Sequence, residues 1–350
     1  MKRRPPAPDG LAFDAARWAP IAALLKEARQ AVVATHIHPD GDAIGSQVAM
    51  VRLLRRLGAT ACGVLPDEVP YNLRFLDPAG VIRCTTEGRA ESALRGADLV
   101  VVLDVSKADR LGRLCDPVLA STARRVCIDH HADGDFPAHA AVLDTAASST
   151  GELICELAHV VLGPEPLPRE LALPLYVAVL TDTGGFRFSN TGPRTHRLAA
   201  ELLATGIEPP QVHHEVYEKN KPEVLRLLGM ALAGLQTDVD GRLAWVNVTQ
   251  EQLRAASARP EDVDGFVDLP RTLDGVQIVI LFMELASGRL KVSLRSRDGV
   301  NVQRLASGFG GGGHIHAAGI LMDGPWDRAR ESVLEAARQL LRAAAPEPGA

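Results

Sequence analysis

The stretch AVVATHIHPDGDAIGS, residues 31–46, decides the fold. It opens with an apolar, β-rich run, Ala31–Thr35, and passes through polar residues into a helical stretch, Ala43–Leu57. Pro39 and Gly41 predict a turn between the two, because both residue types favour turn conformations. A fully apolar strand that leads directly into a helix is typical of an α/β protein, in which helices cover both faces of a parallel sheet.

Outward from this stretch, the alternation of strands and helices continues to about residue 191. Further apolar strands are expected at Thr60–Leu65, Leu99–Leu103 and Arg124–Ile128, and helices at Ser149–Leu162 and Arg169–Leu180. Strands that are apolar throughout and separated by helices indicate a parallel sheet that is buried on both faces.

From Gly241 the pattern changes. Strands are expected at Leu243–Val248, Val276–Glu284 and Arg289–Ser296, and helices at Gln250–Ala256 and Asp327–Ala343. A short turn, Ala286–Gly288, joins the last two strands and indicates an antiparallel component. The sequence therefore predicts an α/β protein with a parallel-sheet domain at 20–195, a helical connection at 196–235 and a smaller α/β domain at 236–345.

Composition narrows the class of function. The 350 residues are 46% hydrophobic and 23% charged, which is the profile of a globular protein with room for two domains. No run of 18 uncharged apolar residues is present, and no apolar segment follows the basic N-terminus, so we expect a cytoplasmic protein without a membrane partner. The five cysteines lack CxxC spacing and are expected to be reduced. The net charge of −5 disfavours a long nucleic-acid footprint and favours a small anionic substrate.

Four polar clusters follow the expected strands and helices, at the edge where open α/β sheets bind ligands. They are His36-Ile37-His38-Pro39-Asp40-Gly41-Asp42, Asp104, Asp129-His130-His131 and Thr181-Asp182-Thr183-Gly184. In the first cluster, an EF-hand loop is excluded because its twelfth position would be Val51, which cannot donate oxygen. Helix capping by Asp42 stays open, but it leaves His36 and Asp40 without a role.

From these clusters, six side chains are expected to bind metal: four carboxylates and two imidazoles, with no thiolate. The metal ligands expected from them are His36, Asp40, Asp42, Asp104, His130 and Asp182. This donor set suits two divalent ions such as Mn²⁺, about 3.5–4 Å apart, which would activate a bridging hydroxide. Asp104 is central and is expected to bridge the ions. Because side chains alternate along a strand, one of the adjacent histidines is expected to bind metal and the other substrate, while Asp129 orients a ring.

These motifs resemble those of the DHH phosphoesterase family, in the order that the family has them. The match consists of His36 to Ser46, Asp104, Asp129-His130-His131 and Thr181–Gly184, and the stretch Gly310–Gly319 resembles the glycine-rich motif of the DHH-associated domain. The resemblance covers about residues 30–322, and length and domain order resemble the bifunctional oligoribonuclease (nanoRNase)/pAp phosphatase branch.

The resemblance implies a Mn²⁺-dependent hydrolase with exonuclease activity, in which a metal-bound hydroxide attacks and nucleoside 5′-monophosphates are released. It makes His130 a ligand and His131 a catalytic residue that faces the scissile phosphate. The expected substrates are short RNA and adenosine 3′,5′-bisphosphate (pAp), not long duplexes. Mg²⁺ or Co²⁺ in place of Mn²⁺, and a homodimer, stay open.

The C-terminal glycines also satisfy GxGxxG at Gly308–Gly313, but a helix rather than a strand is expected before them, which disfavours a dinucleotide site. Glycines instead let backbone N–H groups approach an anion. The substrate contacts expected are therefore Arg295, Gly312, Gly313, His314 and, from the first domain, Arg187.

Four other functions compete. Hydrolysis of cyclic dinucleotides or of linear pApA needs the same two domains. A type II inorganic pyrophosphatase shares the metal motifs but lacks the glycine motif, and RecJ-type exonucleases are larger. A catalytically inactive nucleotide-binding module would have lost a ligand, whereas all six candidates are present.

Overall fold

The fold is described from a computed structural model of the chain. The structure describes residues 14–84, 88–131, 134–263, 265–297 and 299–343. The chain divides into two compact units, and the boundary lies between Lys219 and Asn220. This boundary falls inside the segment 196–235, and the domain limits expected from the sequence stay a prediction.

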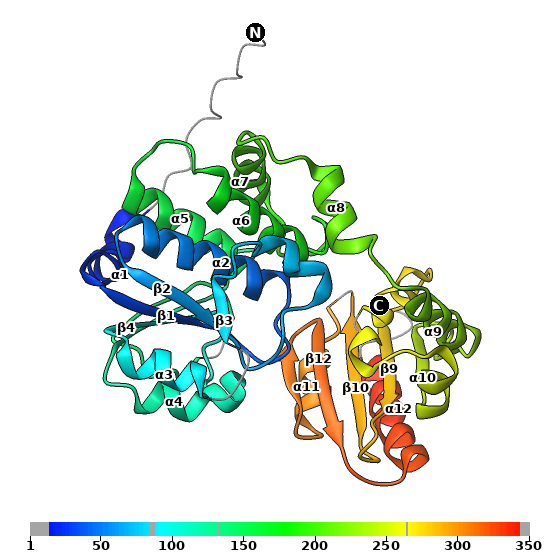
Figure 1. Cartoon of the computed structure of the whole chain (residues 1–350). Helices are drawn as coiled ribbons and strands as arrows, with labels where there is room; N and C mark the ends of the chain where they lie inside the picture. Colours follow the sequence, from blue (N-terminus) through cyan, green and yellow to red (C-terminus); the bar gives the residue numbers. More distant parts are fainter. Residues whose placement is uncertain (1–13, 85–87, 132–133, 264, 298, 344–350) are drawn as a thin grey trace. The chain divides into compact units, whose positions relative to one another are not determined.

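The first unit contains a six-stranded sheet in the order β3-β2-β1-β4-β5-β6, and every neighbouring pair is parallel (Figure 1). Its strands are β1 (Gln30–Ala34), β2 (Thr60–Val64), β3 (Ile82–Cys84), β4 (Leu99–Leu103), β5 (Arg124–Asp129) and β6 (Ala140–Leu143). Its helices are α1 (Ala15–Glu27), α2 (Gly41–Arg56), α3 (Arg89–Gly96), α4 (Cys115–Ala120), α5 (Thr150–Leu162), α6 (Arg169–Asp182), α7 (Pro193–Leu203) and α8 (Pro209–Tyr217), with 3₁₀ turns η1 (Tyr71–Leu76) and η2 (Ala108–Leu114).

Alternate residues of the central strands face two separate cores. Val33 and Val101 pack into the larger core with α1, α2, α5 and α6, whereas Val32 and Val100 pack into a smaller core with α3 and α4. The helices therefore cover both faces of the sheet. Burial on both faces explains why β4 is apolar at all five positions.

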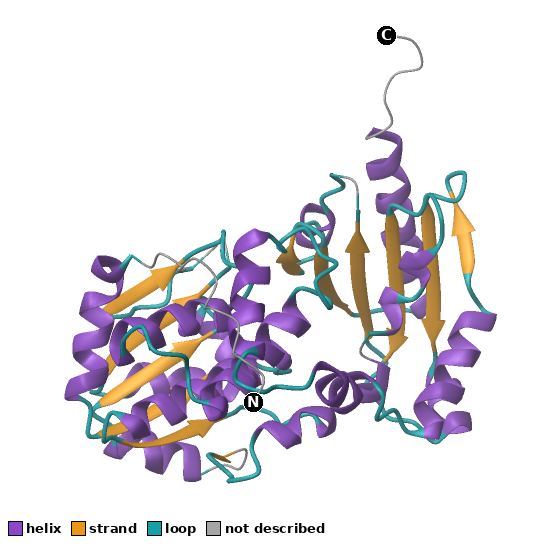
Figure 2. Ribbon diagram, turned by 90° about the horizontal axis from the view of Figure 1, so that it is seen from above, coloured by secondary structure: helices purple, strands orange, loops and turns teal. Residues whose placement is uncertain are grey.

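The second unit contains a mixed six-stranded sheet in the order β11-β12-β10-β9-β8-β7 (Figure 2). Only the pair β8–β9 among its described neighbours is parallel. Its strands are β7 (Gln236–Asp238), β8 (Leu243–Val248), β9 (Ile278–Glu284), β10 (Leu290–Ser296), β11 (Gly312–His314) and β12 (Ala317–Met322). Its helices are α9 (Pro222–Ala233), α10 (Gln250–Ala256), α11 (Val302–Ser307) and α12 (Trp326–Ala343), with 3₁₀ turns η3 (Pro260–Val263), η4 (Phe266–Asp268) and η5 (Pro270–Thr272).

The predicted fold class is confirmed: the first unit has the parallel sheet, and the second has the smaller sheet with antiparallel pairs. The glycine-rich segment forms the edge hairpin β11–β12, in which Gly313 pairs with Ala318. Among the described residues, no helix combines the length and the apolar character that a membrane-spanning helix needs.

Candidate metal centre

Six side chains meet at the carboxyl edge of the first sheet, and one of them is Asp40, which caps α2. His36 follows β1, Asp104 follows β4, and His130 follows β5. Because β1, β4 and β5 are neighbours in the sheet, the loops after them lie side by side. Asp42 in the first turn of α2 and Asp182 at the end of α6 complete the same edge.

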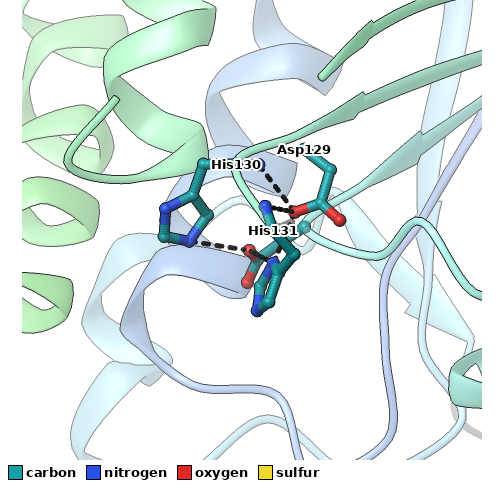
Figure 3. Close-up of side chains that lie close together, drawn as sticks. Asp129, His130 and His131 are labelled. Carbon is teal, nitrogen blue, oxygen red and sulfur yellow. Dashed lines mark hydrogen bonds and ion pairs between the residues drawn. The ribbon is translucent and has the colours of Figure 1, made fainter. Parts of the chain in front are cut away.

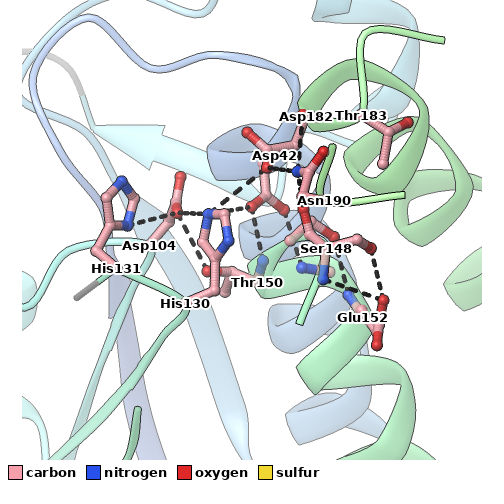
Figure 4. Close-up of polar contacts among 12 residues, drawn as sticks. Asp42, Asp104, His130, His131, Ser148, Thr150, Glu152, Asp182, Thr183 and Asn190 are labelled. Carbon is pink, nitrogen blue, oxygen red and sulfur yellow. Dashed lines mark hydrogen bonds and ion pairs between the residues drawn. The ribbon is translucent and has the colours of Figure 1, made fainter. Parts of the chain in front are cut away.

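His130 lies at the middle of the cluster (Figure 4). Its Nε2 atom is 3.8 Å from Asp42 Oδ2, 3.6 Å from Asp104 Oδ1 and 3.6 Å from Asp182 Oδ2. On the other side of Asp104, His36 Nε2 is 3.1 Å from Asp104 Oδ2. The structure thus places three carboxylates around the imidazole of His130. One of them, Asp104, also contacts the imidazole of His36.

The potential ligand atoms form three overlapping groups, within each of which all atoms are at most 4.8 Å apart. The groups are His36-Asp40-Asp104, Asp104-Asp129-His130-His131 and Asp42-His130-Asp182. All six ligands expected from the sequence are present, and Asp104 belongs to two groups. Their individual roles stay predictions, but a cluster of this composition is a possible metal site.

The second ring nitrogen of each central histidine is occupied, as it is in most metal-binding histidines. His36 Nδ1 lies 2.7 Å from Ile37 O, so Nδ1–H donates to this carbonyl and Nε2 faces the carboxylates. The ring of His130 also forms a hydrogen bond with the backbone of Ala147. Both rings are therefore oriented by the main chain toward the cluster.

Asp129 organises the adjacent histidines (Figure 3). Its Oδ1 atom accepts the backbone N–H groups of His130 and His131, at 2.7 and 3.2 Å, and lies 2.6 Å from His131 Nδ1. The two imidazole rings stand at 70° with centroids 4.8 Å apart. Asp129 is fully buried, so it fixes the turn and the ring of His131 together.

Opposing effects govern the charges of the two central groups. Burial alone would lower the pKa of His36, but its hydrogen bond to Asp104 and the charges of Asp104 and Asp40 raise this pKa to about 9. Burial alone would raise the pKa of Asp104, but the hydrogen bond with His36 and the charges of nearby histidines hold this pKa well below its usual range. In the absence of a metal ion, the two groups form a buried ion pair.

The outer carboxylates are electrostatically unfavourable without a cation. Burial and the charges of Asp104 and Asp182 raise the pKa of Asp42 well above its ordinary value. Burial, followed by the charges of Asp40 and Asp104, raises the pKa of Asp182 in the same direction. A quarter of the Asp182 side chain is exposed, and it lies among the charges of Asp40 and Asp104. Divalent cations would remove this repulsion, so the residues fit a metal centre.

Glycines allow the helices that carry these ligands to approach closely. A Cβ atom at Gly41 of α2 would lie 2.4 Å from Thr181 Oγ1 of α6, and one at Gly45 would lie 2.3 Å from Pro174 O. A Cβ atom at Gly151 of α5 would lie 2.4 Å from the Cβ of Ala178. Contact between the backbones thus brings Asp42 and Asp182 to the same point.

The predicted substrate contacts lie in both units. Arg187 is exposed; its Nε donates to Gly184 O at 2.6 Å, and its guanidinium lies 6.0 Å from the ring of Phe188. In the second unit, Arg295 on β10 donates from Nη1 to Leu294 O, with its Nε 3.7 Å from Asp268 Oδ1.

The two glycines of the edge strand β11 that are predicted to bind substrate differ in the space around them. A Cβ atom at Gly313 (φ 136°) would lie 2.4 Å from Ala317 O, whereas one at Gly312 would meet nothing within 4 Å. The backbone of His314 belongs to β11, but its side chain lies outside the described part of the structure. Substrate binding by these residues stays a prediction.

Sequence reasoning missed several residues that touch the cluster, among them Thr150, Arg110, Ser46 and Asn190. Thr150, the first residue of α5, contacts both Asp42 and Asp104. Arg110 in η2 places Nη1 3.5 Å from His131 Nε2. The Ser-x-x-Glu pattern at Ser149–Glu152 signals the start of a helix, but nothing local signals which distant carboxylates that start will contact.

Comparisons with known proteins agree with this arrangement. Residues 30–179 match the family model described as "DHH family, N-terminal domain", and residues 246–343 match the DHHA1 domain. The bifunctional oligoribonuclease and PAP phosphatase NrnA of Thermus thermophilus is 36% identical over 310 residues, which are 88% of this chain and 89% of that protein. The protein of the same name from Bacillus subtilis is 27% identical over 84% of this chain and 89% of its own length.

Solved structures share the fold. An exopolyphosphatase-related protein from Bacteroides fragilis, 27% identical, has a TM-score of 0.89 over 95% of this chain and 99% of its own. RecJ of Thermus thermophilus, crystallised in complex with Mn²⁺, is 17% identical and has a TM-score of 0.57 over 99% of this chain and 57% of its own.

Proposed function

Because this chain belongs to the DHH family of phosphoesterases, we propose that it hydrolyses short oligoribonucleotides to nucleoside 5′-monophosphates and pAp to AMP. The observation that carries the proposal is the arrangement of three carboxylates within 3.6–3.8 Å of His130 Nε2. It is supported by relatives that bear the name of this bifunctional activity and match along both units.

We assign the metal centre to two Mn²⁺ ions, with Asp104 shared between them. His36 and Asp40 would complete one set of ligands, and Asp42, His130 and Asp182 the other. When bound, such ions lower the pKa of a coordinated water and neutralise charge on the phosphoryl group. Oxygen and nitrogen donors without thiolate suit Mn²⁺, and Mg²⁺ or Co²⁺ are alternatives to be compared with it.

The remaining polar groups act on the substrate. An ionised Asp129 can only accept hydrogen bonds, so His131 Nδ1 carries the proton that lies between them. His131 Nε2 then faces away from Asp129, and it can accept a proton and, once protonated, donate to a phosphoryl oxygen. Arg110, 3.5 Å from Nε2, can donate to the same phosphoryl group. We further propose that Arg187, Arg295, Gly312, Gly313 and His314 bind parts of the substrate that do not react.

Turnover of five substrates tests this function. Purified protein with Mn²⁺ should release AMP from pAp and 5′-monophosphates from pApA and short RNA, with little hydrolysis of long RNA, and EDTA should stop the reaction. An Asp104→Asn protein purified in parallel controls for contaminating nucleases. Absence of Mn²⁺-dependent turnover of both pAp and short RNA would sink the proposal, and faster hydrolysis of c-di-AMP would favour a cyclic-dinucleotide phosphodiesterase. A cytoplasmic location and a homodimer remain proposals.

A further inference from the structure

The N-terminal end of α5 contacts two carboxylates of the cluster. The Thr150 hydroxyl donates to Asp104 Oδ1 at 3.1 Å, and its backbone N–H donates to Asp42 Oδ2 at 2.7 Å. Thr150 is fully buried, and none of the six predicted ligands is a threonine. Its hydroxyl and its backbone N–H therefore hold two of the predicted ligands, Asp104 and Asp42.

These contacts determine which way each carboxylate faces. Asp104 receives Thr150 on Oδ1 and lies beside His36 on Oδ2. Asp42 receives Thr150 on Oδ2 and the backbone of Gly151 on Oδ1. A carboxylate held at both oxygens keeps its plane, so the remaining lone pairs point in fixed directions.

A network of polar side chains, defined here as the brace, holds the chain just before Thr150 (Figure 4). Glu152, buried in α5, accepts the backbone N–H and the hydroxyl of Ser148, at 3.2 and 2.5 Å. Arg194 of α7 lies against Glu152, with Nε 2.9 Å from Oε1. Asn190 donates to Ser148 O at 2.8 Å and also lies 3.3 Å from Asp182 Oδ2, so the brace reaches a third ligand.

We propose that Thr150 is a positioning residue for the metal centre, an inference that rests on the function proposed above. We propose further that the Glu152–Arg194 pair holds Thr150 at its position beside the two carboxylates. The hydroxyl orients the carboxylate that is shared between the ions, and the brace prevents the start of α5 from moving away. Outer groups of this kind typically change metal affinity by about 10- to 100-fold when they are removed.

A pair of near-isosteric variants isolates the hydroxyl. Thr150→Val removes the donor at nearly constant volume, whereas Thr150→Ser retains it. Titration of metal-free protein with MnCl₂ by calorimetry should show affinity reduced about 10- to 100-fold in the valine variant and close to wild type in the serine variant. Thr195→Val, at a buried threonine that caps α7, controls for the general cost of this substitution.

The brace provides a second test that leaves Thr150 intact. Arg194 and Arg17 both bind Glu156, but among the described contacts only Arg194 also binds Glu152. Arg194→Met should weaken Mn²⁺ binding, while Arg17→Met should lower the melting temperature without changing Mn²⁺ affinity.

If Thr150→Val binds Mn²⁺ with wild-type affinity, the inference is overturned and the proposed function stands. The same conclusion follows if Thr150→Val and Thr195→Val weaken Mn²⁺ binding equally. A wild-type protein that binds no Mn²⁺ overturns both, because there is then no centre to position.

Discussion

Asp104 combines a predicted metal-binding role with a backbone conformation that is costly for its residue type. Its φ of 58° lies in the left-handed region, which most residues with a side chain avoid. Strain of this kind costs of the order of 1–3 kcal/mol and is retained mainly at functional sites. The backbone N–H of Asp104 donates to Ile128 O, which ties the strained residue to the adjacent strand.

Substitutions of Asp104 should separate function from stability. Asp104→Ala and Asp104→Gly should both abolish Mn²⁺-dependent turnover, since both remove the shared carboxylate. Glycine tolerates a positive φ, so the glycine variant should be more stable than the alanine variant by about 1 kcal/mol. Thermal unfolding in EDTA measures the difference, and near-normal turnover by either variant would contradict the role of Asp104.

His131→Ala should lower kcat strongly and leave metal content nearly unchanged. The reason is that His131 is held by Asp129, whereas His130 faces the three carboxylates. Metal analysis of the purified variant checks the distinction. If the content of Mn²⁺ falls together with activity, His131 is itself a ligand and the assignment of the two histidines is wrong.

Arg110→Ala should reduce kcat/KM for pAp by about 10- to 100-fold, the loss expected for a charge-assisted hydrogen bond to a phosphoryl oxygen. Arg113 lies on the same 3₁₀ turn and is exposed, so Arg113→Ala is the matched control and should behave like wild type. Equal effects of the two variants would indicate a general electrostatic effect instead of contact with substrate.

Helices α2 and α6 bring together carboxylates whose pKa values are raised, and this predicts how stability depends on pH. At pH values between the ordinary pKa of such a group in the unfolded chain and its higher pKa in the folded protein, the group binds more protons in the folded state. The free energy of unfolding therefore decreases as pH rises through this range. For Asp42 and Asp182 this loss begins near pH 4 and continues upward, and His36 adds to it between about pH 6.5 and 9. Asp104 acts in the opposite sense, and its contribution is lost only below about pH 4.

Asp182→Asn should therefore stabilise the metal-free protein at high pH. At pH 4 the variant and wild type in EDTA should melt at similar temperatures, because the raised pKa of Asp182 keeps its carboxyl from ionising near the ordinary pKa of an aspartate. At pH 8–9 the variant should melt at a higher temperature, and Mn²⁺ should reverse the order by stabilising wild type alone. A difference in melting temperature that is independent of pH would exclude the proposed repulsion.

The elements differed in how well the sequence could predict them. Strands β1, β4 and β5 are apolar on both faces, and the loops after them necessarily meet, so the strands and the convergence of the polar clusters could be predicted, whereas the roles of the ligands stay predictions. Strand β6 is half exposed, and β11 is rich in glycine, so neither carries the apolar signal of a buried strand. Helix α5 was expected at Ser149–Leu162, but the contact of its first residue, Thr150, with Asp42 spans 108 residues and depends on tertiary packing.

The whole molecule joins two units of different architecture. We expect the second unit to contribute to substrate binding. Arg295→Ala in the second unit should mainly raise KM for pAp, with kcat/KM lowered about 30- to 150-fold, if its guanidinium binds a terminal phosphate. Bis-p-nitrophenyl phosphate, which lacks that phosphate, should be cleaved equally by variant and wild type. Equal losses on both substrates would mean that Arg295 acts on folding or on the metal centre.

The glycine contacts of α2 bear on which ions the centre can accept. Ca²⁺ is held at about 2.3–2.6 Å from oxygen ligands, whereas Mg²⁺ is held at 2.0–2.1 Å. In a site lined by long, mobile side chains, a larger ion is accommodated by a change of rotamer. Here Gly41 and Gly45 already place backbone against α6, so a wider spacing of Asp42 and Asp182 would require two whole helices to shift. If the proposed centre binds two ions, we therefore expect discrimination by ionic radius to depend on the main chain and to persist when individual ligands are exchanged for others of similar length.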